Sequence, residues 1–202
     1  MQLTTKKLKS LISEVLDEAA RGVTDLHEEV FVTIEKYKDE IRIYYSDSKG
    51  NFKRLGVVKV EKISEYAWSR DLPCDNGMMI SYSHVASGWG PMLYDVAMEV
   101  ATILAGGLTS DRTIVSDDAY GVWDYYLNKR PNVSRDQLDN EDGDLTPDIQ
   151  SDDCLQNSAH DHRKKSRTWQ ASPLSKIYSK DPSTLQTLQS AGKLINKMNL
   201  SF

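Results

Sequence analysis

The chain has 202 residues, a length that suits one compact domain with extensions. Its formal net charge of −5 argues against a general nucleic-acid binder or a protein held on an anionic membrane, because both need a cationic surface. The sequence has no run of about 18 apolar residues, so we expect no membrane span, and two cysteines are too few for a disulfide framework, which favours a reducing cytoplasm.

The first predicted element is an amphipathic helix over residues 5–20, in which apolar side chains recur at helical spacing. Its lysines precede its acids, the unfavourable order for the helix dipole, so this helix is expected to need a partner surface. Apolar residues concentrate before Lys129. We therefore divide the chain into a leader helix (1–22), a core (23–131) and an acidic, loop-rich extension (132–202).

Alternating apolar residues next predict an antiparallel meander. Three strands are expected at residues 30–34, 41–45 and 52–60, each with its apolar side chains on one face. Residues 47–51 read Asp-Ser-Lys-Gly-Asn, which is a strong turn signal before the third strand. A fourth strand, residues 78–85, is apolar enough to lie centrally.

A long helix is expected over residues 92–104, ended by the glycines at 106–107. Leu108 then begins a short strand. Asp95 and Glu99 lie one turn apart and are expected on the solvated face of the helix rather than as an acid–base pair. The buried stripe is predicted from the spacing of three and four between Leu93, Val96, Ala97, Val100, Ala101 and Leu104.

A second helix is predicted from the N-cap Ser116 through Lys129. Residues 132–170 show no periodicity, so we expect loop there, and a short terminal helix is expected within 183–198. Trp169 and Leu174 form an apolar island that is expected to pin the tail onto the domain.

The turn between the fourth strand and the long helix reads Ser87-Gly88-Trp89-Gly90-Pro91. Glycines let the backbone approach a ligand, and the N-terminus of the following helix favours a pyrophosphate. A dinucleotide-binding fingerprint would need a third glycine where Leu93 stands, and the Gly-Lys-Ser/Thr triplet of a P-loop is missing. The alternative is that the two glycines merely form a tight corner.

This order of elements resembles the GNAT (GCN5-related) N-acetyltransferases, in which the coenzyme A pyrophosphate lies on the turn after the fourth strand. The family turn Gln/Arg-x-x-Gly-x-Gly/Ala is matched by residues 85–90, with Val85 at the basic or amide position. The resemblance implies an α/β (α+β) fold with a mixed, largely antiparallel sheet flanked by helices. It also implies acetyl-CoA binding by Val85, Ala86, Gly88, Trp89, Gly90 and Met92.

The later family pattern Asn-x-x-Ala-x-x-x-Tyr falls on residues 116–123. Ala119 matches, whereas Trp123 replaces the tyrosine that acts as general acid, and an indole cannot serve as that acid. Tyr126 is the candidate substitute. For the base that deprotonates the amine, the candidates are His84, by its pKa, and Tyr82; the alternative for His84 is a rim position with a satisfied hydrogen bond.

The resemblance implies that a coenzyme A thioester and an unknown amine are the substrates. No counterpart of the family's last two strands, which help to bind the acceptor, is visible after the second helix. This departure favours the alternative function, a catalytically decayed GNAT-fold protein that acts as a virion-associated or host-interacting module.

Two further patterns complete the sequence. Cys154, His160 and His162 could offer zinc ligands, but their spacing matches no standard finger, so we expect a charged loop and no metal. The leader helix and the segments 90–99 and 172–176 resemble an uncharacterised GNAT-like protein of large tailed bacteriophages. This resemblance implies a phage-encoded protein of the host cytoplasm, packaged in the virion in one version, with capsid or host proteins as partners.

Overall fold

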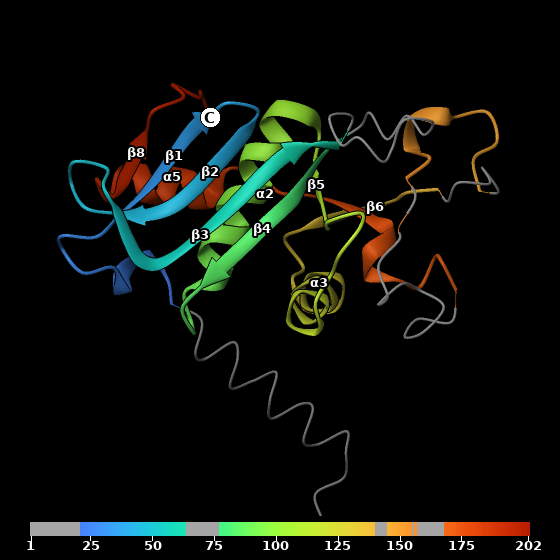
Figure 1. Cartoon of the computed structure of the whole chain (residues 1–202), viewed down its shortest axis with the longest axis horizontal. Helices are drawn as coiled ribbons and strands as arrows, with labels where there is room; N and C mark the ends of the chain where they lie inside the picture. The colour runs from blue at the N-terminus through green and yellow to red at the C-terminus, as the bar shows by residue number, and fades with distance from the viewer. Residues whose placement is uncertain (1–20, 64–76, 140–144, 155, 157–167) are drawn as a thin grey trace, which may run out of the picture.

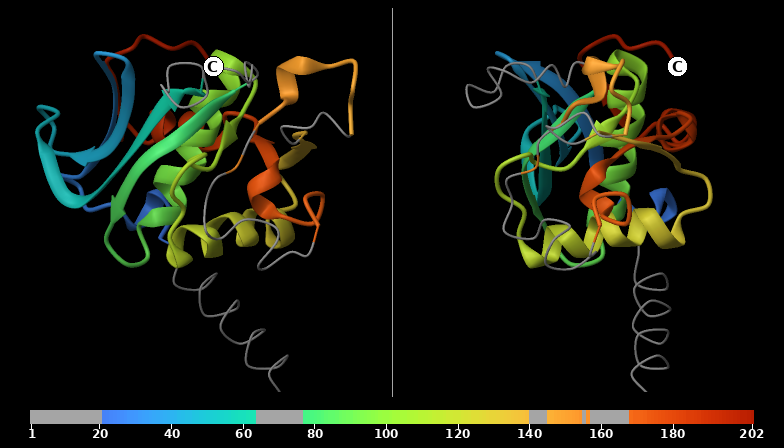
Figure 2. Two further views of the ribbon diagram at one scale, coloured as in Figure 1. Left: turned by 45° about the vertical axis from the view of Figure 1, so that its right-hand side comes forward. Right: turned by 90° about the vertical axis from the view of Figure 1, so that its right-hand side faces the viewer.

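The computed structural model describes residues 21–63, 77–139, 145–154, 156 and 168–202. They form a mixed α/β fold around one eight-stranded sheet with the strand order β6-β7-β5-β4-β3-β2-β1-β8 (Figure 1). The helix α2 (Gly90–Ala105) packs on the sheet, and α5 (Ser183–Ser190) covers α2 from the other side (Figure 2). Within this described part, no helix is long and apolar enough to cross a membrane. The predicted helix over 5–20 lies outside the described residues.

The predicted meander is confirmed. Strands β1 (Phe31–Tyr37), β2 (Glu40–Ser46), β3 (Phe52–Lys62) and β4 (Met78–Val85) pair antiparallel in chain order. The predicted turn is held by the Asp47 carboxylate, which accepts two backbone N–H groups at 2.9 Å. Alternating residues face α2 and form the core, including Val32, Ile34, Ile41, Ile43, Tyr45, Val58 and Val60.

Strands β4 and β5 (Leu108–Thr109) are paired over only a short length. Strand β5 pairs parallel with Met78 and Met79 only. Along residues 80–85, β4 is therefore paired with β3 on one edge and with no other strand among the described residues. Ser81 is also the extra residue of an irregularity in the β3–β4 ladder, a feature that is frequent next to functional sites.

The prediction that residues 132–170 contain only loop was wrong, and so was the expected loss of two final strands. Strands β6 (Ser134–Gln137) and β7 (Lys176–Ser179) form an antiparallel pair, and β7 lies between β5 and β6. Strand β6 reads Ser-Arg-Asp-Gln and lies at the sheet edge, where backbone pairing suffices and apolar alternation is not needed. The stretch expected as an extension thus contributes to the central sheet.

The second predicted helix is confirmed as α3 (Asp117–Lys129), and the Ser116 hydroxyl accepts the Ala119 N–H at 3.2 Å. The terminal helix is shorter than predicted. It ends at Ser190, because Gly192 adopts a positive φ of 65°, and β8 (Leu194–Asn196) follows and pairs parallel with β1. Three short 3-10 turns complete the described elements: Val23–Asp25, Gln150–Asp152 and Pro173–Ser175.

The expected solvated face of the long helix was also wrong. Glu99 is fully buried and Asp95 is 7% exposed, whereas Leu104, assigned to the buried stripe, is 44% exposed. The reason is tertiary: Glu99 accepts hydrogen bonds from the buried Lys180 and from the first amides of α5, so a second helix covers the expected solvent face. The prediction for Trp169 is confirmed, because its ring is buried and its N–H donates to the Leu138 carbonyl at 2.6 Å.

Candidate functional site

The turn between β4 and α2 has a fixed inner side and an open outer side. Gly88 has a φ of 81°, a left-handed conformation that a side chain would make costly. Inside the turn, the Trp89 ring packs edge-on against Tyr45, whose hydroxyl donates to the Trp89 carbonyl at 2.8 Å. On the outside, the N–H groups of Gly88 and Gly90 have no acceptor among the described residues, and a side-chain cap is lacking at the start of α2.

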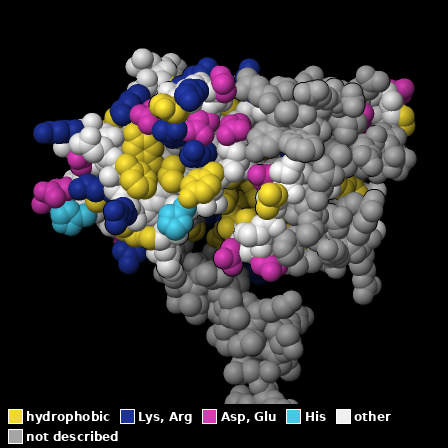
Figure 3. All heavy atoms as spheres, viewed as in Figure 1, with side chains coloured by type: hydrophobic (Ala, Val, Ile, Leu, Met, Phe, Trp, Pro, Cys, Tyr) yellow, Lys and Arg dark blue, Asp and Glu magenta, His cyan; other side chains and the backbone are white. Residues whose placement is uncertain are grey.

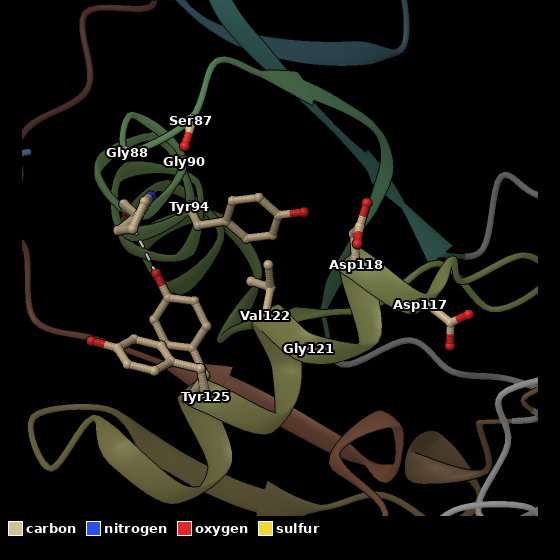
Figure 4. Close-up of a pocket in the computed structure, with 11 residues that line it drawn as sticks. Ser87, Gly88, Gly90, Tyr94, Asp117, Asp118, Gly121, Val122 and Tyr125 are labelled. Carbon is tan, nitrogen blue, oxygen red and sulfur yellow. Dashed lines mark hydrogen bonds between the residues drawn. The ribbon is translucent and has the colours of Figure 1, made fainter. Parts of the chain in front are cut away.

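A cavity of about 450 Å³ opens between this turn, the first part of α2 and α3 (Figure 4). We call it the aromatic cavity. Figure 4 shows the Tyr94 ring lying across it, with Gly121 and Val122 on the α3 wall and Asp117 and Asp118 at the far end. Its volume falls within the usual range for small-molecule sites. The lining residues are Ser87, Gly88, Gly90, Pro91, Tyr94, Asp117, Asp118, Gly121, Val122, Tyr125 and Tyr126.

Ser83 of β4 contacts Tyr94 in the wall of the aromatic cavity. The Tyr94 hydroxyl donates to Ser83 Oγ at 3.0 Å, which places Ser83 on the α2 side of the strand. Burial raises the pKa of Tyr94 above its usual value, although the bond to Ser83 opposes this shift. Because side chains alternate along a strand, the neighbours of Ser83 point to the opposite face.

Tyr82 and His84, the base candidates of the sequence, are these neighbours. Both are exposed, and Lys59 Nζ lies 5.6 Å from the centre of the Tyr82 ring. Neither side chain lines the aromatic cavity. Figure 3 looks onto this opposite face, on which hydrophobic side chains gather among basic and acidic ones.

Tyr126, the predicted acid, does line the aromatic cavity, but a carboxylate holds its hydroxyl. It donates to Asp95 Oδ1 at 2.6 Å, and Asp95 Oδ2 accepts from Arg130. Burial raises the pKa of Tyr126 well above its usual value, and the negative charge of Asp95 adds to this effect. Trp123, which replaces the family tyrosine, is buried in the core and packs on Tyr178 with 5.1 Å between ring centres.

A second cavity of about 310 Å³ lies on the other side of Pro91. We call it the arginine cavity. It is adjacent to the aromatic cavity, because Pro91 lines both and because Asp95 in one wall is hydrogen-bonded to Tyr126 in the other. Its lining residues are Arg21, Gly22, Val23, Pro91, Met92, Asp95, Arg130, Ser183, Thr184 and Thr187.

The structure separates the predicted binding residues into three groups. Gly88, Gly90 and Tyr126 line the aromatic cavity, and Met92 lines the arginine cavity. Val85, Ala86 and Trp89 line neither.

Sequence reasoning missed Tyr94, Asp95, Arg21 and Arg130. The first two could have been found, because they lie one helical turn beyond Gly90 and Pro91 and must project beside the same turn. No sequence signal relates Arg21, which precedes the first strand, to a turn near residue 88.

The residues considered for zinc do not form a described site. Cys154 is buried and disulfide-bonded, so its sulfur is not a thiolate ligand, and the expectation that the cysteines are reduced was wrong. His160 and His162 lie outside the described residues. Within the residues that the structure covers, no group of three or more His, Cys, Asp or Glu side chains could hold a metal ion.

Comparison of the chain with family models, with curated proteins and with solved structures finds no match. What the site can bind must therefore be inferred from its own groups. They are two free amides at a helix N-terminus, a tyrosine-lined cavity with carboxylates at its far end, and an adjoining cavity with two guanidinium groups.

Proposed function

We propose that the protein is an acyl-CoA-dependent acyltransferase of the GNAT type, which transfers an acetyl group to an amine. The observation that carries the proposal is the aromatic cavity, which adjoins the free amides of Gly88 and Gly90 and is lined by Tyr94, whose hydroxyl donates to Ser83 on β4. Strands β6 and β7, which form an antiparallel pair after α3, also support the GNAT resemblance, because the family has two last strands after its second helix.

The phosphate end of the cosubstrate is supported by the turn. The amides of Gly88 and Gly90 precede a sixteen-residue helix, and its positive end favours a diphosphate. A Cβ atom at Gly90 would meet no other atom within 4 Å, so the space beside this amide is open.

The acyl arm is supported by the strand edge. Pantetheine is extended and carries two amide groups, and an unpaired strand edge offers N–H and C=O groups to such a chain in the manner of an added strand. Residues 80–85 of β4 form this edge, and Tyr94, Pro91 and Val122 supply apolar surface for the methylene groups.

Asp117 and Asp118 indicate where the amine binds. Both residues line the end of the cavity farthest from the glycine turn, and the Asp118 carboxylate, which lies on the Tyr94 side, would attract an ammonium group (Figure 4). We propose Asp118 as the base that takes the proton from this ammonium, because it lines the cavity whereas His84 and Tyr82 do not. The amine nitrogen then attacks the thioester carbonyl, the C–N bond forms and the C–S bond breaks.

The leaving thiolate needs a proton. Tyr94 lies in the cavity with its hydroxyl bound to a neutral serine, whereas the Tyr126 hydroxyl is held by a carboxylate. A phenol that donates to a carboxylate is the poorer acid, because its ionisation would put two negative charges side by side. Tyr94 is therefore the better donor, and its phenolate then takes the second proton from the positively charged nitrogen of the tetrahedral intermediate, which leaves a neutral amide and a neutral tyrosine.

Thermal unfolding in the presence of acetyl-CoA tests the proposal. At a ligand concentration of about 100 times Kd, binding adds about 2.7 kcal/mol and raises Tm by roughly 5–10 °C. Gly90→Glu should abolish this shift, because the added carboxylate repels the phosphates, and it should still fold, because its Cβ has room. Ile103→Glu, near the other end of α2, is the matched control and should keep the shift. A wild-type protein that shows no shift at saturating acetyl-CoA rules the proposal out.

The second candidate is a cofactor-binding protein of this fold without turnover, acting as a virion-associated or host-interacting module. It is favoured by Trp123, which is buried where the family has its acid, and by the Tyr126–Asp95 bond. Thiol release from acetyl-CoA, followed over a panel of small amines and lysine peptides, separates the two. Binding with no thiol release above the buffer rate supports the second candidate.

A further inference from the structure

We propose that the arginine cavity binds the 3′-phosphate of the coenzyme A moiety. This inference rests on the proposed function and assigns a phosphomonoester subsite to residues from opposite ends of the chain. The cavity adjoins the glycine turn at Pro91, so a ligand whose diphosphate lies on that turn can reach it without crossing the aromatic cavity.

Arg21 brings a positive charge to the turn. Its backbone N–H donates to the Gly88 carbonyl at 2.9 Å, and its guanidinium lies over the Trp89 ring, 4.9 Å from the ring centre. No carboxylate among the described residues pairs with this guanidinium.

Arg130 approaches the same cavity from the end of α3. One of its terminal nitrogens donates to Asp95, and the guanidinium also interacts with Tyr125. Its Nε is buried, so only the remaining terminal N–H groups can donate to a further acceptor. The guanidinium carbon lies 5.7 Å from the centre of the Tyr126 ring, so packing against a buried side chain fixes its position.

Two hydroxyl groups complete the donor set. Ser183 Oγ and Thr184 Oγ1 each accept from the buried Lys180 Nζ at 2.9 Å, so their own protons must point elsewhere. Among the described residues, neither proton has an acceptor. Thr187 differs, because its hydroxyl already donates to the Ser183 carbonyl at 2.7 Å.

The carboxylate that lines the cavity and the one beneath it already accept hydrogen bonds. Asp95 binds Tyr126 through one oxygen and Arg130 through the other. Glu99, beneath Lys180, accepts from that lysine and from two backbone amides of α5. The cavity therefore offers donors in excess, which suits a ligand group made of several negative oxygens. A phosphomonoester has three such oxygens and close to two negative charges at neutral pH.

Isothermal titration calorimetry with acetyl-CoA and with 3′-dephospho-acetyl-CoA tests the inference. The wild type should bind acetyl-CoA about tenfold more tightly, since charge-assisted hydrogen bonds to the 3′-phosphate are lost in the second ligand. Arg21→Gln should reduce this preference to about twofold while leaving the affinity for the dephospho ligand unchanged. Ser183→Ala gives a second, independent reduction. Arg54→Gln, an exposed arginine on β3, is the matched control and should keep the full preference.

Each other outcome overturns the inference in a distinguishable way. Equal affinity of the wild type for both ligands excludes the subsite but leaves the acyl-CoA proposal standing. Failure to bind either ligand removes both proposals. Inorganic phosphate that binds the wild type, fails to bind Arg21→Gln and is not displaced by acetyl-CoA would assign the cavity to another phosphate compound.

Discussion

The two cavities on either side of Pro91 differ in almost every chemical respect. The aromatic cavity has tyrosine and glycine walls with carboxylates at its far end, whereas the arginine cavity has guanidinium groups and hydroxyl protons. The helix α2 contributes to both, because Tyr94 and Asp95 are neighbours that project about 100° apart around its axis. One helical step thus separates a surface suited to an acyl arm from a surface suited to phosphate.

The comparison also shows how a buried carboxylate can serve an anion site. Asp95 and Glu99 would repel phosphate if they were unpaired, but their oxygens bind Arg130, Tyr126, Lys180 and the amides of α5. Through these bonds Asp95 holds Arg130, and Glu99 holds Lys180, in a fixed orientation beside the cavity. Predictions that disturb one side of Pro91 and leave the other intact test this division.

The largest effect is expected from Glu99→Ala. It leaves the ammonium of Lys180 buried without its carboxylate, which should cost about 3–5 kcal/mol and lower Tm by roughly 10 °C. Because Lys180 orients Ser183 and Thr184, the preference for acetyl-CoA over its dephospho form should also fall.

The surface pair Lys197–Glu35 provides the control for Glu99→Ala. These side chains are 41% and 23% exposed, so Glu35→Ala should cost less than about 1 kcal/mol. Equal destabilisation by the two variants, measured by urea unfolding, would show that Glu99 contributes no more than a surface charge.

A smaller effect is expected from Tyr126→Phe, which removes the hydrogen bond between the two cavities. Asp95 loses a donor, and the free energy of unfolding should fall by about 1–2 kcal/mol at pH 7. The size of this loss should depend on pH. The pKa of Tyr126 is raised in the folded state by burial and by Asp95, so its contribution is complete below about pH 10 and is lost as the pH rises through the folded pKa.

Unfolding curves at pH 7 and pH 10.5 measure this dependence. The wild type should lose more stability between the two values than Tyr126→Phe does, because the variant has one buried phenol fewer to ionise. Tyr37→Phe, at a 46% exposed position, should follow the wild type. A variant with the same alkaline loss as the wild type would show that Tyr126 ionises as freely in the folded as in the unfolded chain.

The smallest effect is expected from Gly121→Ala in the α3 wall of the aromatic cavity. Its Cβ would meet no atom within 4 Å, and alanine in a helix interior is favoured over glycine by about 0.5–1 kcal/mol, so the fold should become slightly more stable. Acetyl-CoA affinity should change while the ratio to the dephospho ligand stays constant. Gly106→Ala should instead destabilise the fold, since Gly106 has a φ of 85°.

The sequence predicted the parts of the fold that depend on local patterns. The strands of the meander alternate, the long helix has an apolar stripe, and Ser116 begins α3 as an N-cap. Strand β6 was not predicted, because four residues at a sheet edge need no apolar side chains. Strand β8 was not predicted, because its three residues were assigned to the end of the terminal helix. Both depend on partners far away in the chain.

The same limit applies to the candidate site. Gly88 and Gly90 could be identified from their spacing, whereas Asp95 and Glu99 were assigned to the surface because their partners were unknown. No residue near Glu99 in the sequence predicts its ion pair with Lys180, which lies 81 residues later. The orientation of Tyr82 and His84 was open for a simpler reason. Strand alternation fixes which residues share a face, but only the contact from Tyr94 to Ser83 shows which face is directed towards α2.

Strand β7 is inserted between β5 and β6, although it follows β6 in the chain by almost 40 residues. During synthesis on a ribosome, the meander and α2 would emerge first and could form contacts that are local in sequence, which fold fastest. Strand β5 can pair with β7 only after Tyr178 has been synthesised, and α5 is synthesised later still. A nascent chain halted after residue 170 would expose the free edge of the two-residue strand β5 and the uncovered carboxylate of Glu99, two groups that the complete chain buries.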